Sequence, residues 1–175
     1  MKKVFIDTNI LLDVLAKRAP FYPASATVWT LAETGKIMGM ISTLSFNNIY
    51  YIMRRQSGGA GAKMAIRLLH GIFSTVPPDN QILNQALDSE LADFDDALQF
   101  FSALHAGASC IVTRNPGDFP AGHIPILTPE EFLAANRVKL LDATYPEGAA
   151  PIKEIRDAAP RLQHPVKPAK PRKVR

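Results

Sequence analysis

Aspartates at three separate places in the chain have the residue types and spacing that metal-assisted chemistry needs. Asp7 follows an apolar run, residues 4–6, and precedes a helical pattern, which is where an open α/β sheet binds its ligands. Asp93, Asp95 and Asp96 stand close together, and Asp118 follows the apolar run 110–113. Clustered carboxylates repel one another, and a hard cation such as Mg²⁺, which prefers oxygen ligands, removes that penalty. The pattern therefore favours a divalent-metal site.

Each aspartate also has a purely structural interpretation. Asp7 and Asp93 fit helix N-caps, whose side chains accept hydrogen bonds from the first backbone amides of a helix. Asp95 and Asp96 are favourable at the positive end of a helix dipole, and Asp118 fits a turn residue. Three acidic groups at strand ends or helix starts are nevertheless more informative together than singly.

Polar side chains beside these acids are candidates for supporting roles. Thr8 and Asn9 can hold a carboxylate or a phosphate near a helix N-terminus. Thr113 ends the run 110–113, and Asn115 lies between this run and Asp118. Arg114, between them, is a candidate phosphate contact, with an ordinary surface arginine as the alternative.

The elements that must position these residues alternate short apolar runs with helical patterns, which predicts a parallel sheet with helices on its faces. The predicted strands cover residues 4–6, 38–41, 73–76, 110–113 and 124–127. The predicted helices cover residues 9–16, 23–34, 44–55, 62–72, 81–87 and 130–136, with a further one that begins after Asp93. This further helix carries one apolar stripe, made of Phe94, Ala97, Leu98, Phe101 and Leu104.

The composition indicates an ordinary globular protein, with 47% apolar and 21% charged residues. No apolar run is long enough to cross a membrane, and the N-terminus does not resemble a signal peptide. The single cysteine, Cys110, lies in an apolar run and is expected to be buried and reduced. We therefore expect a cytoplasmic protein that does not interact with a membrane.

The positive net charge of the chain comes from its C-terminal part. Residues 1–136 carry 10 Lys or Arg against 12 Asp or Glu, whereas residues 137–175 carry 10 against 4. Because proline also recurs there, we predict a domain at 1–136 and a basic, Pro-rich, mostly disordered tail at 137–175, with a short helix near 152–159. Such a tail can bind nucleic acid, contact a partner or be dispensable.

No competing catalytic set appears in the sequence. The four histidines, at 70, 105, 123 and 164, lack the spacing of zinc ligands. The chain also lacks the Gly-x-Ser-x-Gly nucleophile elbow and the Gly-rich phosphate loop with its lysine.

The acidic motifs, in their order and spacing, resemble those of the PIN domain family over about residues 3–134. They read Ile6-Asp-Thr-Asn9, Asp93-Phe-Asp-Asp-Ala97 and Thr113-Arg-Asn-Pro-Gly-Asp-Phe119. The resemblance implies a three-layer α/β/α fold around a central parallel sheet of about five strands. It also implies hydrolysis of RNA that depends on Mg²⁺ or Mn²⁺.

Carried over by position, the resemblance assigns Asp7, Asp96 and Asp118 as the catalytic, metal-binding acids. Asn9 matches the polar residue that steadies the first of these acids. We expect supporting roles for Thr8, Asn48, Asp93, Thr113 and Asn115, and an RNA contact for Arg114.

Asn48 departs from the family pattern. The helix after the second strand often carries a glutamate, in a stretch of the form Ser-x-x-Thr-x-x-Glu-Leu. Here Ser42-Thr-Leu-Ser-Phe-Asn-Asn-Ile49 fits the spacing, but Asn48 occupies the glutamate position. An amide oxygen still accepts a hydrogen bond from a metal-bound water, although it brings no charge. The Asn-Asn pair resembles one PIN subgroup, VapC-like in type, whose site then has three acids.

Three functions stay open on this basis. The leading hypothesis is a metal-dependent endoribonuclease that acts as the toxin of a type II toxin–antitoxin pair, with RNA as substrate, an antitoxin partner and a homodimeric state. The second is a weakened PIN domain that binds RNA or protein without cutting, motivated by Asn48. The third is a phosphatase with Asp7 as nucleophile, which is disfavoured because no second acid stands two residues on.

Overall fold

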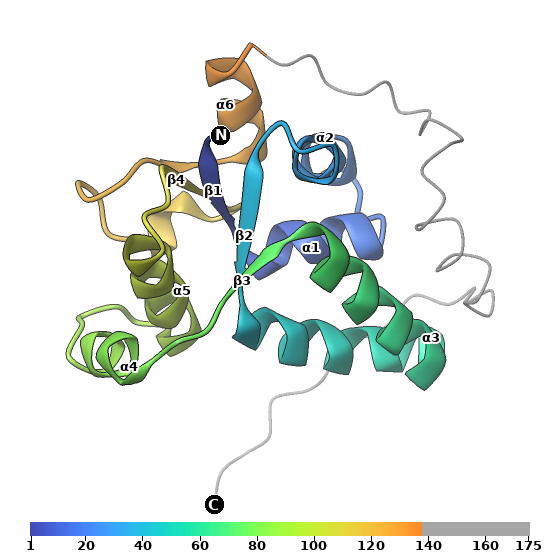
Figure 1. Cartoon of the computed structure of the whole chain (residues 1–175), viewed down its shortest axis with the longest axis horizontal. Coiled ribbons are helices and arrows are strands. Elements are labelled where there is room, and N and C mark those ends of the chain that lie inside the picture. Colours follow the sequence, from blue (N-terminus) through green and yellow to red (C-terminus); the bar gives the residue numbers. More distant parts are fainter. Residues whose placement is uncertain (138–175) are drawn as a thin grey trace, which may run out of the picture.

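The computed structural model describes residues 1–137, which form a five-stranded parallel sheet with helices on both faces (Figure 1). The strand order is β3-β2-β1-β4-β5. The strands are β1 (Lys3–Ile6), β2 (Met38–Ser42), β3 (Ser74–Val76), β4 (Cys110–Val112) and β5 (Ile126–Leu127). The helices are α1 (Thr8–Leu15), α2 (Tyr22–Glu33), α3 (Thr43–Ile72), α4 (Asn80–Leu87), α5 (Phe94–His105) and α6 (Pro129–Ala135), with a 3₁₀ turn, η1 (Pro116–Asp118). The predicted α/β fold with a central parallel sheet is confirmed.

Alternation along the strands divides the core into two layers. Val4 and Ile6 of β1 pack with α1, α2, α3 and α6, whereas Phe5, between them, packs with α5 on the opposite face. Successive side chains of a strand point to opposite faces, so a strand covered on both sides is apolar at every position. Figure 1 shows the resulting arrangement, with α4 and α5 on one side of the sheet and α1, α2 and α3 on the other.

Helix α5 contradicts the prediction of a single apolar stripe. Phe94, the first residue of that stripe, is 44% exposed, whereas Phe100, outside it, is buried against the sheet. The helix packs on two sides, because Phe100 and Ala103 contact the sheet layer while Ala97 and Leu98 contact α4. Of the predicted stripe, Ala97 and Leu98 thus face α4, Leu104 packs on the sheet layer and Phe101 contacts both, so the stripe spans the two packing sides.

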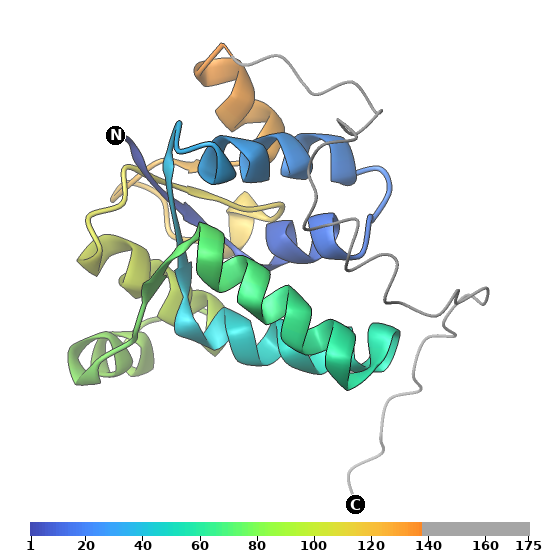
Figure 2. The same cartoon turned by 45° about the vertical axis from the view of Figure 1, so that its right-hand side comes forward.

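Helix α3 is a hairpin of two helical arms. The gap between the predicted helices contains a bend at Gly58, whose φ of 74° is readily adopted only by glycine. The arms before and after the bend lie side by side in two views (Figures 1 and 2). The predicted helices at 44–55 and 62–72 correspond to these two arms.

The last elements fit the sequence signals closely. Strand β5 is shorter than predicted, because Pro125 has no N–H and joins the ladder only through its carbonyl, which accepts from the Ile111 amide at 3.0 Å. Thr128 caps α6 in a reciprocal pair with Glu131, as the Thr-Pro-Glu-Glu sequence predicts.

The predicted tail lies outside the described residues, apart from Arg137. No helix within the described part of the chain is long and apolar enough to cross a membrane.

Candidate active site

The candidate site is built at the carboxyl ends of β1 and β4, which are neighbours in the sheet. Ile6 of β1 pairs with Val112 of β4, so the next residues, Asp7 and Thr113, emerge side by side. The Asp7 amide donates to the Val112 carbonyl at 3.0 Å and extends the ladder by one bond. Asp7 is 4% exposed and Thr113 is fully buried. Two buried polar residues of the site thus directly follow two adjacent strands.

Asp7 is held by several hydrogen bonds. The Thr113 hydroxyl donates to Asp7 Oδ2 at 2.6 Å, and Asn9 Nδ2 donates to the same oxygen. The Asn9 backbone amide donates to Asp7 Oδ1, so Asp7 is also the N-cap of α1. Burial raises the pKa of Asp7, and hydrogen bonds from Thr113 and Gln99 act in the opposite direction. The structural role expected for an N-cap and the placement expected for a functional acid therefore coincide in one residue.

Asn9 and Thr113 form a small network that joins three segments. Asn9 Nδ2 donates to the Thr113 hydroxyl oxygen at 3.1 Å, and Asn9 Oδ1 accepts from the Arg114 amide at 3.3 Å. The same hydroxyl oxygen accepts from the Asn115 amide at 3.1 Å. Since a hydroxyl has one donor and two acceptor positions, that of Thr113 is fully used. Its orientation is fixed, and with it that of the Asp7 carboxylate.

Thr8 anchors the site to two other helices. Its hydroxyl shares a 2.7 Å hydrogen bond with the Ser45 hydroxyl on α3, and its backbone amide donates to Gln99 Oε1 on α5 at 3.4 Å. Gln99 is 7% exposed and lies one turn after Asp96 on the same face of α5. Gln99 and Ser45 are site residues that the sequence did not reveal, although the spacing of Gln99 from Asp96 was a usable signal.

The second acidic group lies at the start of α5. Asp93 is its N-cap, with Oδ1 accepting from the amides of Asp95 and Asp96 at 2.8 and 3.2 Å. Asp96 is half-buried, and its pKa is raised to about 6 by burial and then by the charges of Asp7, Asp93, Asp118 and Asp95, in that order. The negative charges of all four other aspartates therefore act on the Asp96 carboxylate.

Asn48 contacts the acidic group directly. Its Nδ2 donates to Asp95 Oδ2 at 2.9 Å, from the first arm of α3 to the first turn of α5. The amide therefore stands beside a carboxylate that a glutamate at this position would repel.

An open cleft of about 600 Å³ lies at this site. The lining includes four of the aspartates together with Thr8, Asn9, Asn48 and Gln99. Two arginines, Arg18 and Arg114, also line it. Asp118 does not belong to the lining; it is exposed at the end of η1, although its charge reaches Asp96. The structure therefore places Asp7 and Asp96 in one cleft and Asp118 nearby.

Arg114 forms an ion pair with Asp13, a residue that the sequence did not mark as part of the site. The Arg114 Nε lies 3.4 Å from Oδ2 of Asp13, which is fully buried in α1. The Arg114 guanidinium lies 4.5 Å from the ring centroid of Phe21. A charged residue inside the apolar run of α1 was the available signal, because a buried carboxylate is seldom left unpaired.

The donor set of the cleft suits Mg²⁺ in kind, since it consists of carboxylate, amide and hydroxyl oxygens. Within residues 1–137, no three carboxylate, imidazole or thiolate groups converge enough to surround a cation by themselves. Mg²⁺ commonly keeps several waters and uses only one or two carboxylates. The aspartates gathered around Asp96 favour a cation here, because a positive charge would relieve the repulsion between them.

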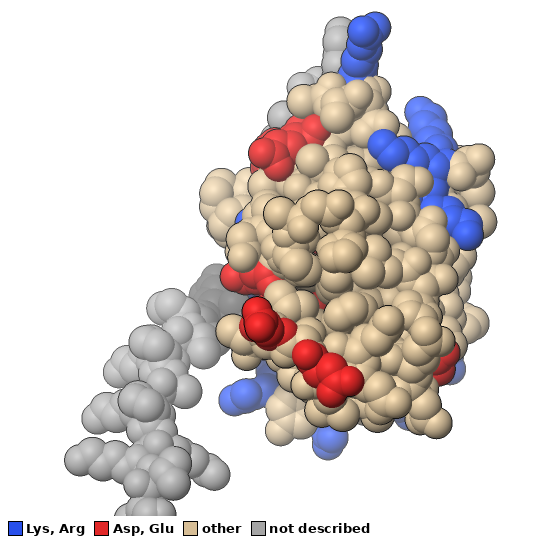
Figure 3. Space-filling model, turned by 90° about the vertical axis from the view of Figure 1, so that its left-hand side faces the viewer, with Lys and Arg blue, Asp and Glu red and all other residues tan. Residues whose placement is uncertain are grey.

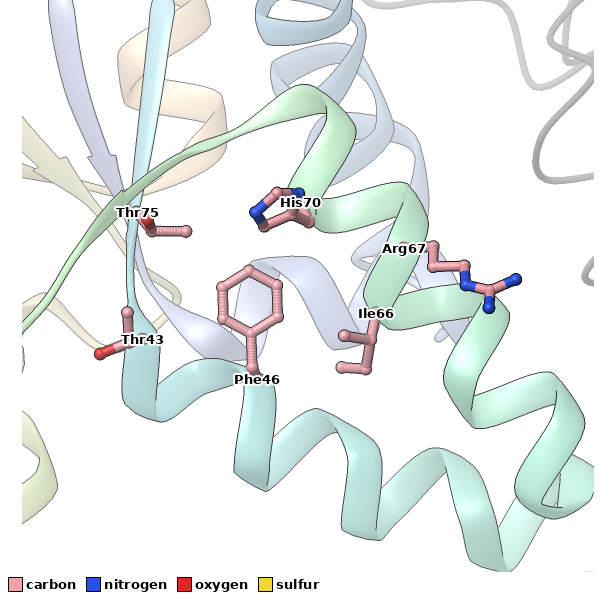
Figure 4. A pocket seen from close by; sticks show the side chains of 6 residues that line it. All are labelled: Thr43, Phe46, Ile66, Arg67, His70 and Thr75. Atoms are coloured by element: carbon pink, nitrogen blue, oxygen red, sulfur yellow. The ribbon is translucent and has the colours of Figure 1, made fainter.

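A second hollow, of about 470 Å³, lies between the two arms of α3. Figure 4 shows Phe46 of the first arm and Ile66 and His70 of the second directed into this space. The rings of Phe46 and His70 are 6.4 Å apart, and the lining is mainly apolar. It carries no carboxylate, which distinguishes it from the acidic cleft.

The surface outside the cleft is not broadly basic on the side of α4 and α5. Figure 3 shows acidic side chains scattered over this face and basic ones along its edges. A phosphate backbone is attracted mainly by Lys and Arg. Individual cations close to the cleft therefore matter more here than a general positive field.

Known proteins share this fold and part of this sequence. The chain is 24% identical over 135 residues to "Ribonuclease VapC1" of Aquifex aeolicus, covering 75% of this chain and 93% of that protein. Among solved structures, the VapC20 toxin of Mycobacterium tuberculosis, described as cleaving the sarcin-ricin loop, superposes with a TM-score of 0.51 at 16% identity, covering 62% of this chain and 86% of that one.

Two solved complexes have the same fold in one of their chains. The DNA-bound VapBC of Salmonella typhimurium matches with a TM-score of 0.56 at 15% identity, covering 74% of this chain and 99% of that one. A toxin–antitoxin complex from Klebsiella pneumoniae matches with a TM-score of 0.55 at 21% identity, covering 72% and 97%. The family model of the PIN domain matches residues 3–116, which contain Asp7, Asp96 and the hydrogen-bond network between β1 and β4. This chain belongs to the PIN domain family.

Proposed function

We propose that the protein is an endoribonuclease that hydrolyses RNA phosphodiester bonds with Mg²⁺ or Mn²⁺. The observation that carries the proposal is the pairing of buried Asp7 with Asp96, whose pKa is raised to about 6 by burial and by four neighbouring carboxylates. Such a group of acids in an open cleft is electrostatically unfavourable without a cation. The similarity to the Aquifex aeolicus ribonuclease supports the choice of RNA as substrate.

In this proposal, Asp7 and Asp96 would hold the metal, directly or through water, and Asp118 would bind a second ion or orient water. A bound Mg²⁺ supplies positive charge for the phosphate and lowers the pKa of water. Thr113 and Asn9 keep the Asp7 carboxylate in one orientation through their hydrogen bonds.

The remaining site residues keep this geometry in place. Asp93 fixes the first turn of α5 as its N-cap, and Thr8 ties the start of α1 to α3 and α5. Thr113 and Asn115 are joined by a hydrogen bond that shapes the loop after β4. Arg114, which lines the same cleft, would contact an RNA phosphate.

The direct test compares the wild type with Asp7→Asn and Asp96→Asn in an RNA-cleavage assay with Mg²⁺ or Mn²⁺. Both substitutions are expected to lower the rate by at least about a hundredfold, because each removes a carboxylate that no other group replaces. Asp88→Asn is the matched control, since Asp88 is an exposed aspartate at the end of α4, outside the cleft. Cleavage that survives both site substitutions, or persists in a chelator, contradicts the proposal.

We further propose that the protein is the toxin of a type II toxin–antitoxin pair and works as a homodimer in the cytoplasm. Support comes from the similar solved structure that is described as a toxin–antitoxin complex and from the VapC20 structure, which is described as that of a toxin. An antitoxin would occupy the acidic cleft with a segment of its own. Expression of the wild type is expected to arrest bacterial growth while Asp7→Asn does not; growth that is unaffected by the wild type contradicts the toxin assignment.

A second candidate is a PIN domain that binds RNA or protein without cutting. The hydrogen bond from Asn48 to Asp95 favours it, because the position that often carries a glutamate in this family here carries a neutral amide that donates to one of the acids and adds no charge. Tight binding of RNA by the wild type, with no cleavage in either metal, would select this candidate.

A further inference from the structure

Asp13 is a buried charge that the proposed chemistry does not use. It lies in α1, is 0% exposed and is surrounded by the apolar core of the α1 layer. A carboxylate in such surroundings is strongly disfavoured unless charged or hydrogen-bonding groups compensate it. Its partners therefore indicate why the chain places it there.

Two arginines and one serine converge on Asp13. Arg114 Nε lies 3.4 Å from Asp13 Oδ2, and the Ser25 hydroxyl donates to the same oxygen at 3.3 Å. Arg18 Nη1 lies 4.0 Å from the other oxygen, Oδ1. The three charged residues come from α1, the loop after it and the loop after β4, so the contact joins segments 101 positions apart in sequence.

Both arginines keep free N–H donors on the side of the cleft. Their side chains are 34% exposed for Arg18 and 23% for Arg114, and both line the acidic cleft. One carboxylate against two guanidinium groups leaves a net positive charge. Each guanidinium also has five N–H donors, and together the two have more donors than the Asp13 carboxylate can accept. The Phe21 ring beside Arg114 further limits the positions that its guanidinium can take.

We propose that Arg18 and Arg114 form a phosphate-binding subsite for the RNA chain beside the reactive position, and that buried Asp13 positions both arginines. The inference rests on the proposed function, because it takes the ligand of the cleft to be RNA. The planar, multidentate guanidinium matches the geometry of a phosphate. The arrangement places positive charge on one part of a cleft whose other charged residues are four aspartates.

The competing explanation is that Arg114 only neutralises Asp13. Arg114→Gln alone does not separate the two, because it leaves a buried carboxylate uncompensated and can unfold the protein. The double variant Asp13→Asn with Arg114→Gln removes both charges together and keeps polar side chains at both positions. Arg18→Gln is a second probe, since Arg114 and Ser25 still satisfy Asp13.

The experiment measures binding of a short fluorescein-labelled single-stranded RNA of mixed sequence, by anisotropy in a chelator and over a range of salt concentrations. Without metal there is no cleavage, so the result does not depend on whether the protein proves to be a nuclease. Lys36→Gln is the control, because Lys36 is an exposed cation just before β2, at the end of the sheet opposite to the cleft.

Arg18→Gln and the double variant are each expected to bind several-fold more weakly than the wild type. For single strands, the slope of log affinity against log salt is expected to flatten by about 0.7 for each phosphate that the variant no longer neutralises. Lys36→Gln is expected to match the wild type, and the unfolding temperatures identify any variant that does not fold. A folded double variant with the affinity and slope of the wild type would overturn the subsite, and so would a wild type that does not bind the RNA at low salt.

Discussion

The hydroxyl of Thr113 donates a 2.6 Å hydrogen bond to the carboxylate of Asp7, across the boundary between β4 and β1. The two residues are 106 positions apart in the sequence, and the strand register alone brings them together. Thr113 has no charge and no catalytic chemistry of its own in this site. Its importance lies in fixing the carboxylate on which the proposed metal site depends.

Thr113→Val is predicted to reduce stability by about 1–3 kcal/mol, because it removes a donor from a buried carboxylate and an acceptor from the amides of Asn9 and Asn115. The pKa of Asp7 rises further, since the Thr113 hydrogen bond is one of the contacts that lower it. Denaturant unfolding measures the loss of stability, and the pH dependence of Mg²⁺ binding measures the change in the pKa of Asp7. Thr113→Ser keeps the hydroxyl and should resemble the wild type in both; equal behaviour of Val and Ser variants would contradict the prediction.

Asp96 predicts an unusual pH dependence of stability in metal-free protein. Its carboxyl has an ordinary pKa of 3.8 in the unfolded chain and a pKa of about 6 in the fold, so the folded state holds its proton more tightly between these values. The contribution of Asp96 to stability is therefore present below about pH 4 and is lost as pH rises through 6.

Asp96→Asn cannot ionise and should be more stable than the wild type at pH 7, by about 1 kcal/mol once solvent screening is allowed for. The difference should disappear near pH 4, as measured by denaturant unfolding in a chelator. Added Mg²⁺ should stabilise the wild type and have little effect on the variant. A gap that is constant with pH would show that Asp96 does not carry the raised pKa.

Gly39 predicts a packing effect that is independent of the site. A Cβ there would lie 2.7 Å from Phe73 Cδ1 and 2.8 Å from Ala32 Cβ, both closer than real contacts allow. Gly39→Ala is therefore expected to destabilise the protein by about 1–3 kcal/mol. Gly59→Ala is the control, because a Cβ at that position would meet nothing within 4 Å and alanine favours a helix. Thermal unfolding compares the two, and equal melting temperatures would contradict the packing argument.

The sequence was sufficient to predict the order of the elements and the parallel sheet. Four of the five strands were visible as short apolar runs, whereas β3 reads Ser-Thr-Val, and a parallel sheet brings residues that follow its strands to one edge. The position of Asp7 after residues 4–6 therefore made it a candidate for a site, with a helix N-cap as the alternative. The capping box at Thr128 was equally local, because both of its partners lie within one helical turn.

The features that could not be predicted depend on contacts between distant segments. The pairing of Asp13 with Arg114 needs the loop after β4 to pass over α1, and neither residue specifies that path. The two packing faces of α5 depend on where α4 lies, since Phe100 and Ala97 are both apolar and differ only in their neighbours. A hydrophobic stripe identifies that a helix is buried but not how many elements cover it.

Asn48 gives the sharpest test of how this site differs from the usual family pattern. Asn48→Glu places a new carboxylate beside Asp95, which now accepts a hydrogen bond from the Asn48 amide at 2.9 Å. In metal-free protein the repulsion should lower stability by up to about 1 kcal/mol, because the pair is partly exposed. In RNA cleavage the Mg²⁺ concentration needed for half-maximal rate should fall several-fold, since the cation gains a negative neighbour.

The control variant Asn48→Gln has a side chain as long as that of glutamate but without the charge, and it should show neither change. Equal Mg²⁺ requirements for the two variants would show that this position does not contribute to metal binding. An inactive wild type that begins to cut RNA only as Asn48→Glu would instead assign the natural protein to the binding-module class.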